Sequence, residues 1–170
     1  MISLKDIDWN RITSLTSEEK RKVFDENVEF LYKMVEEIRI KGIGCVDDII
    51  SKAKDDFLEI SLILLTFGSY EEITRVLMTI VNSSNISNLY YFKRIVQIEA
   101  IILCKEGINL LDSYIRLVSY FGDDYTKHSI SYYNAMVKRM EENRLKVEQD
   151  IKAYNEDNTL FDRRVEIEIN

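Results

Sequence analysis

Apolar residues recur at helical spacing along most of the chain, and this pattern predicts five main helices. In the first, over about 17–41, the apolar positions step by four and three residues, which is typical of the buried face of an amphipathic helix. These positions are Phe24, Val28, Leu31, Val35 and Ile38. The same kind of spacing predicts further helices over about 46–67, 70–82, 86–121 and 123–155.

Glycines and capping residues mark the expected boundaries of these helices. Thr16 or Ser17 can cap the start of the first one. Gly42 and Gly44 each cost a helix about 1 kcal/mol relative to alanine, so we expect a helix end, a kink or a tight corner there. Gly68 stands where a left-handed C-cap belongs, which would end the second helix.

Two further features bear on the later helices. Ser69-x-x-Glu72 matches a capping box and predicts the start of the third helix. Gly107 lies inside the long pattern over 86–121, where it indicates either the close approach of another helix or a kink. The helix over 46–67 carries apolar residues around much of its circumference, so it is expected to be buried on most sides.

The composition supports an all-α fold with a single domain. The chain has 170 residues, no proline, five glycines and 46% hydrophobic residues, so helix breakers are scarce. We expect a bundle of about five helices, the last two long, in a helical domain over 1–155. The last helix has a narrow apolar stripe, so its end is expected to project beyond the body. The polar tail over 156–170 is either frayed or orders only against a partner.

Charge and hydropathy exclude several classes of protein. The net charge of −7 argues against a nucleic-acid binder, which would need a basic face. The densest apolar run, Ile60 to Phe67, is far shorter than the roughly 20 residues of a membrane helix. The N-terminus carries charges where a signal peptide needs an apolar core. We therefore expect a soluble cytoplasmic protein, in which Cys45 and Cys104 are buried free thiols.

The residues of catalysis and metal binding are sparse. His128 is the only histidine, and Asp124 precedes it by one helical turn. Such a pair lacks the nucleophile or second acid–base group that catalysis requires, so a surface or capping role is expected. One histidine cannot supply a helical di-iron site or a zinc site. The glycines do not form a phosphate-binding loop. The sequence thus predicts no enzyme, no cofactor and no metal.

Acidic pairs suggest a place where a partner could dock. Asp47-Asp48 and Asp55-Asp56 are eight residues apart, so they lie on a similar side of the predicted helix. They form either a solvated face, with a favourable effect at a helix N-terminus, or an acidic docking face. Both interpretations remain open at the level of sequence.

Two stretches resemble the cytoplasmic portion of MotA-type flagellar stator subunits. The first runs through Arg39-x-x-Gly42-Ile43, Val46-Asp47-Asp48 and Asp55-Asp56-Phe57-Leu58, and is similar to the family's loop between its second and third membrane helices. The second, Lys105-Glu106-Gly107-Ile108, is similar to the family's segment after the last membrane helix. All four membrane helices of the family are missing, so this chain could not conduct ions.

The resemblance implies a non-enzymatic protein–protein interaction module, associated with the bacterial flagellar motor. In the stator family, charged loop residues engage the switch protein of the rotor. The family's arginine corresponds to Arg39 and its acidic partner to Asp47; with their charged neighbours Lys41 and Asp48 they are the predicted partner-binding residues. The expected partner is a rotor or stator component. Arg39 could equally be a helix-end cation that interacts with its own helix dipole.

Two other functions fit the sequence. The chain could be a generic helical scaffold or regulator that forms a homodimer, or binds a partner, through its C-terminal helix, with Met140 and Val147 on the contact stripe. It could also be a small-molecule sensor, because the ten tyrosines would suit a pocket between helices.

Overall fold

The fold is given by a computed structural model. It describes residues 5–53, 55–122 and 125, and a scattered set in the C-terminal part: 131, 134, 135, 137–139, 141, 142, 144, 145, 148, 149, 151 and 152. The chain divides into two compact units, Met1–Ser129 and Ile130–Asn170.

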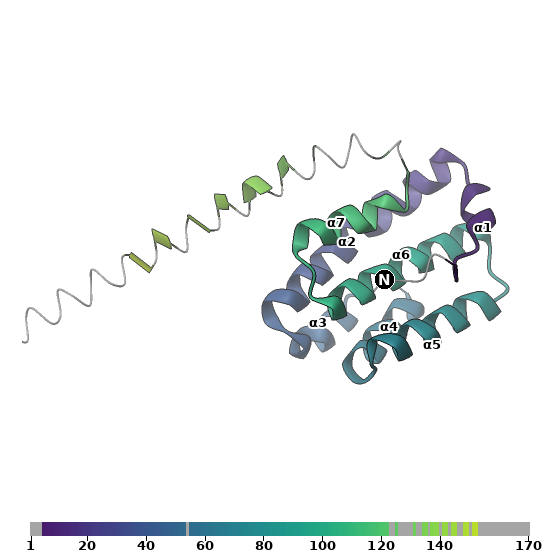
Figure 1. The fold of residues 1–170 in the computed structure, drawn as a ribbon, viewed down its shortest axis with the longest axis horizontal. Helices are drawn as coiled ribbons and strands as arrows, with labels where there is room; N and C mark the ends of the chain where they lie inside the picture. Colours follow the sequence, from purple (N-terminus) through teal and green to yellow (C-terminus); the bar gives the residue numbers. More distant parts are fainter. Residues whose placement is uncertain are drawn as a thin grey trace, which may run out of the picture. The chain divides into compact units, whose positions relative to one another are not determined.

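The described residues form helices and no strands, which confirms the all-α class (Figure 1). The elements of the first unit are α1 Trp9–Thr13, α2 Ser17–Lys41, the 3-10 helix η1 Ile43–Cys45, α3 Val46–Ile50, α4 Asp56–Phe67, α5 Tyr70–Ser83, α6 Asn88–Glu106 and α7 Leu110–Ser119. The prediction of about five helices is therefore wrong, because two expected helices are each divided and a short one precedes them.

The helix expected over 46–67 is divided at Asp55. This residue has an extended backbone, with φ −156° and ψ 156°, and its carboxylate accepts a hydrogen bond from the Leu58 N–H at 2.9 Å. A side chain that satisfies an unpaired N–H at a helix start is an N-cap, so α4 begins anew after Asp55. Neither glycine nor proline marks this break, which is why the apolar pattern alone concealed it.

The helix expected over 86–121 is divided at Gly107. Its φ of 65° is left-handed, which ends α6, and Asn109 then caps α7 by accepting from the Asp112 N–H at 2.8 Å. A Cβ atom added at Gly107 would meet no heavy atom within 4 Å. The glycine is therefore required by the positive φ and not by the close approach of another helix.

Gly68 corrects another expectation. Its φ of −88° and ψ of 153° are extended, so it is no left-handed C-cap. A Cβ atom here would lie 2.7 Å from Cγ1 of Ile73 and 3.2 Å from the Leu64 carbonyl oxygen. Glycine therefore lets the start of α5 pack closely against the end of α4. The predicted cap of α5 is confirmed, since Oγ of Ser69 accepts from the Glu72 N–H at 3.3 Å.

Helix α6 is the centre of the first unit. It packs against α1, α2, α4, α5 and α7, and Figure 1 shows it running between the pair α2 and α7 and the pair α4 and α5. Every residue from Ile95 to Leu103 is buried. A helix that is buried around its whole circumference lies inside the core. The helix predicted to be buried on most sides, 46–67, is instead the one that exposes Ile60, Ile63 and Phe67.

Glu99 is a charge within this buried run. It is 1% exposed, and its Oε1 accepts from Nε of Arg116 on α7 at 2.8 Å. Its Oε2 accepts from Oη of Tyr120 at 2.9 Å, and Arg116 also pairs with Glu106. Burial and the neighbouring Glu99 carboxylate raise the pKa of Tyr120. Trp9 of α1 stacks on Tyr120, with ring centroids 6.4 Å apart.

The described residues between 131 and 152 are helical, and all of them are exposed except the half-buried Val137. Met140 and Val147, the predicted dimer contacts, lie outside the described residues, as does the tail over 156–170. No helix in the described part of the chain is both long enough and apolar enough to cross a membrane.

We predict that Arg116→Leu destabilises the first unit by about 3–5 kcal/mol, because it leaves the buried Glu99 carboxylate without its cation. Urea denaturation measures the change. The matched control is Arg21→Leu, which removes an exposed pair with Asp25 at 3.6 Å and should cost at most about 1 kcal/mol. Equal losses for the two variants would show that the buried pair does not stabilise the fold in this way.

A second prediction concerns the cysteines, which are both free as expected. Cys45 is buried as predicted, whereas Cys104 is only half-buried as a residue. Burial raises the pKa of the Cys104 thiol to about 12. Because the thiolate is the reactive form, we expect iodoacetamide at pH 8 to modify Cys104 at least about a hundredfold more slowly in the native protein than in urea. Mass spectrometry of digested samples gives both rates; similar values would contradict the burial of this thiol.

Candidate functional site

The four residues predicted to bind a partner lie around the corner between α2 and α3. Arg39 and Lys41 belong to the last turn of α2, and Asp47 and Asp48 to the first turn of α3. Gly42 makes the corner with a φ of 77°, a conformation that glycine adopts at little cost. The predicted break of the first helix therefore occurs at this glycine, as a helix end followed by a turn.

Buried side chains hold this corner against the body of the first unit. Four of them flank or form the turn, namely Ile38 at 4% exposure, Cys45 at 7%, Val46 at 1% and Ile49 at 2%. In addition, Sγ of Cys45 donates to the Gly42 carbonyl oxygen at 3.1 Å. The exposed residues of the turn thus project from a backbone that is anchored on both sides.

The outer side of the corner combines apolar and charged groups. Ile40 is 72% exposed and Ile43 is 47% exposed. Together with the four charged residues they form what we call the corner surface, made up of Arg39, Ile40, Lys41, Ile43, Asp47 and Asp48. All six are exposed. Single exposed apolar residues are ordinary, but two that lie among charges of both signs resemble the mixed composition of a protein interface.

The charges of the corner surface differ in their partners. Nζ of Lys41 lies 2.7 Å from Oε1 of Glu37, and this hydrogen bond raises the pKa of Lys41 and lowers that of Glu37. Arg39, Asp47 and Asp48 form no ion pair with any residue that the structure describes. The sequence alone did not show that Lys41 pairs within its own helix while the other three charges do not. The structure leaves these three available to an external partner.

Helix α4 provides a second exposed apolar surface, which the sequence did not reveal. Ile60 is 45% exposed, Ile63 43% and Phe67 87%. Spacings of three and four residues place them on one side of the helix. The sequence predicted a helix buried on most sides, because periodicity alone does not distinguish a face that packs inward from one that stays exposed.

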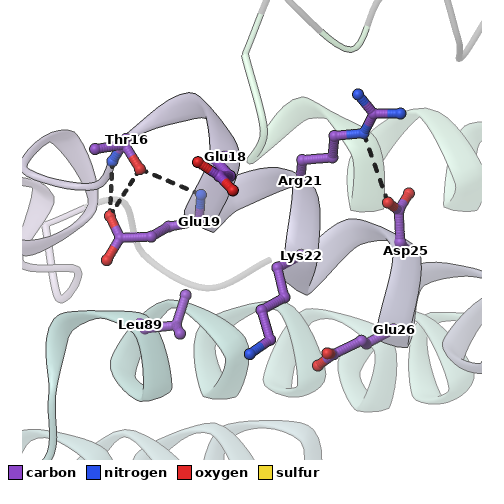
Figure 2. Close-up of a pocket in the computed structure, with 8 residues that line it drawn as sticks. All are labelled: Thr16, Glu18, Glu19, Arg21, Lys22, Asp25, Glu26 and Leu89. Carbon is purple, nitrogen blue, oxygen red and sulfur yellow. Dashed lines mark hydrogen bonds and ion pairs between the residues drawn. The ribbon is translucent and has the colours of Figure 1, made fainter.

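A pocket at the start of α2 has a volume of about 570 Å³ and is lined largely by charged residues (Figure 2). Thr16 and Glu19 form a complete capping box, which confirms Thr16 as one of the two predicted caps. Arg21 pairs with Asp25, and Figure 2 shows Lys22 and Glu26 pointing toward one another. These polar groups serve the helix start and its exposed face, so they indicate no reaction.

The described residues offer no candidate metal site. They contain no group of three or more His, Cys, Asp or Glu side chains that could hold a metal ion. Asp124 and His128, the one candidate acid–base pair, lie outside them. The corner surface is therefore the best-defined candidate site that follows from the sequence.

Comparison with known proteins adds no relative: no family model, no curated protein and no solved structure matches the chain.

Proposed function

We propose that the protein is a non-enzymatic interaction module that docks another protein through the corner surface. The observation that carries the proposal is the exposure of Ile40, at 72%, beside unpaired charges of both signs on an anchored turn. An anchored surface loses little conformational entropy on binding, which favours recognition. The exposed isoleucines can bury apolar area while the charges select the orientation of the partner.

The charges of the corner surface indicate the chemistry of its partner. Arg39 would pair with an acidic group of the other protein, and Asp47 and Asp48 would pair with basic groups. The resemblance of this stretch to the cytoplasmic loop of MotA-type stator subunits supports a component of the flagellar motor. The rotor's switch protein is the first one to test, because charged residues of that loop engage it in the stator family.

We predict that the double charge reversal Arg39→Glu with Asp47→Lys weakens binding to the switch protein by about tenfold or more. Surface plasmon resonance against the purified switch protein measures the affinity. Binding by the wild type should also weaken as salt rises, because exposed charges are screened beyond about 10 Å at 0.1 M.

The matched control is Arg75→Glu with Glu71→Lys on α5. Both residues are exposed and form no ion pair with a described residue, so the variant carries the same change of charge elsewhere. It should bind as the wild type does. Unchanged affinity after reversal at Arg39 and Asp47 would exclude the proposed contact. An equal loss of affinity in both variants would show that binding depends on surface charge in general and not on the corner surface.

A second candidate function, dimerisation through the C-terminal helix, is favoured by two exposed apolar residues of the second unit. Leu145 is 51% exposed and Ile151 is 56% exposed. If they contact a second copy, light scattering should show a dimer that forms with rising concentration and is lost in Leu145→Glu with Ile151→Glu. A monomer at every concentration would rule out this function.

A further inference from the structure

The outward side of α4 carries an apolar stripe that the described elements leave exposed. Ile60, Ile63 and Phe67 follow one another at spacings of three and four residues, so they lie on one side of the helix. Asp56 precedes Ile60 by four residues and begins the same stripe. Phe67 is 87% exposed, more than any other large apolar residue that the structure describes. The buried residues of α4 lie on its opposite side, namely Phe57, Leu58, Ser61, Leu62 and Leu65.

This stripe is long enough to contact a second helix over three turns. At a rise of about 1.5 Å per residue, Asp56 and Phe67 are roughly 17 Å apart along the helix axis. Side chains at such spacings form the ridges that pack into the grooves of a neighbouring helix. We call this surface the α4 face, made up of Asp56, Glu59, Ile60, Ile63 and Phe67, all of them exposed.

The α4 face is acidic at both ends. Asp56 and Glu59 lie in the first turn of α4, whereas Glu71 and Glu72 lie in the first turn of α5, just beyond the end of α4. Helix α5 then runs beside α4 (Figure 1). None of these four carboxylates forms an ion pair with a residue that the structure describes. The sequence from 56 to 74 contains no Lys or Arg that could neutralise them locally.

The cations of α6 that contact α4 are engaged elsewhere on it. The guanidinium of Arg94 lies over the ring of the buried Phe57, 4.9 Å from its centroid. Nζ of Lys105 donates to the carbonyl oxygen of the buried Leu65 at 3.5 Å. A third cation, Lys93, pairs with the N-cap carboxylate of α4 at 2.6 Å. These contacts hold α4 against α6, and no ion pair joins the three cations to the acids of the α4 face.

The charges distinguish between the molecules that could cover this face. An antiparallel pairing with a second copy would set Asp56 and Glu59 against Glu71 and Glu72 of that copy. A parallel pairing would set Asp56 and Glu59 against the same two residues. Like charges opposite one another weaken binding, so either arrangement is disfavoured. An anionic membrane surface is disfavoured for the same reason, because it attracts basic segments and repels acidic ones.

We propose that the α4 face docks an amphipathic helix of another protein, with Lys or Arg at both ends of its apolar stripe. The apolar side chains of that helix cover Ile60, Ile63 and Phe67, and its cations pair with the acids at the two ends. Burial of apolar area then provides affinity, while the charges set the register of the two helices. The α4 face shares no residue with the corner surface, so it is a second and separate place for a partner.

Fluorescence anisotropy of the full chain with two labelled synthetic peptides tests the proposal. Both peptides are helices of about 18 residues with a leucine stripe, held helical by a hydrocarbon cross-link because short free helices are marginal in water. One peptide has lysines at both ends of the stripe, and the other has glutamates at the same positions. The lysine peptide should bind with a dissociation constant below about 100 μM, and the glutamate peptide about tenfold more weakly or worse.

An apolar double variant tests the stripe itself. Ile63→Ser with Phe67→Ser should weaken binding of the lysine peptide by about tenfold or more, because it removes apolar area from the centre of the contact. The matched control is Ile40→Ser with Ile115→Ser, which alters two residues that are 72% and 55% exposed elsewhere. It should leave the affinity unchanged. Since Ile40 belongs to the corner surface, failure of the docking proposal and failure of this one are separable.

A neutral double variant tests the acids. Glu59→Gln with Glu72→Gln removes one charge from each end of the α4 face and should weaken binding of the lysine peptide by about threefold or more. The matched control is Glu18→Gln with Glu141→Gln, two exposed acids that form no ion pair with a described residue. This control makes the same change of net charge and should bind the peptide as the wild type does.

Four results would overturn the proposal. The first is that the lysine peptide does not bind, and the second is that both peptides bind equally well. The third is that each test variant binds as its control does. The fourth is that the face belongs to another occupant: light scattering would then show a dimer that is lost in Ile63→Ser with Phe67→Ser, or anionic vesicles would bind the wild type and not this variant.

Discussion

Burial of the Ile95–Leu103 run of α6 on all sides is the constraint on which the first unit depends. Two polar residues of this helix, Gln97 and Glu99, lie within the buried run, and each has to find its partner on another helix. Glu99 is neutralised by Arg116, which fixes α7 against α6. Gln97 donates to Asp55, which fixes the point where α4 begins. The same burial that forms the core therefore dictates where two neighbouring helices lie.

The corner surface and the Gln97 amide depend on different levels of structure. The corner surface is formed by local structure, since one glycine turns the chain and buried neighbours anchor the turn. The position of the Gln97 amide depends on tertiary structure, because its nitrogen donates to Asp55 while its oxygen has no donor among the described residues.

The sequence predicts best where the signal is local. Helix α2 has the bounds expected from its apolar stripe, because Thr16 caps its start and Gly42 ends it. The break at Asp55 in the helix predicted over 46–67 was not predicted. In the sequence, an aspartate that caps a helix start cannot be distinguished from an aspartate on the exposed face of a continuous helix. The sequence predicted one long helix over 86–121, because the apolar period continues past Gly107 and does not show that this residue has a left-handed φ. The charges Arg39 and Asp47 were predicted from the resemblance of their stretch to the stator family's loop, whereas Gln97 and Asp55 meet across 42 positions of sequence and carry no pattern that joins them.

The stacking of Trp9 on Tyr120 makes the protein its own optical probe. Trp9 is the only tryptophan in the chain, so its fluorescence comes from one known place. Its ring lies on the tyrosine whose hydroxyl donates to Glu99, and that carboxylate pairs with Arg116. Emission from a single indole, recorded without any added label, therefore follows the contact of α1 with the end of α7 and the polar network buried beneath it.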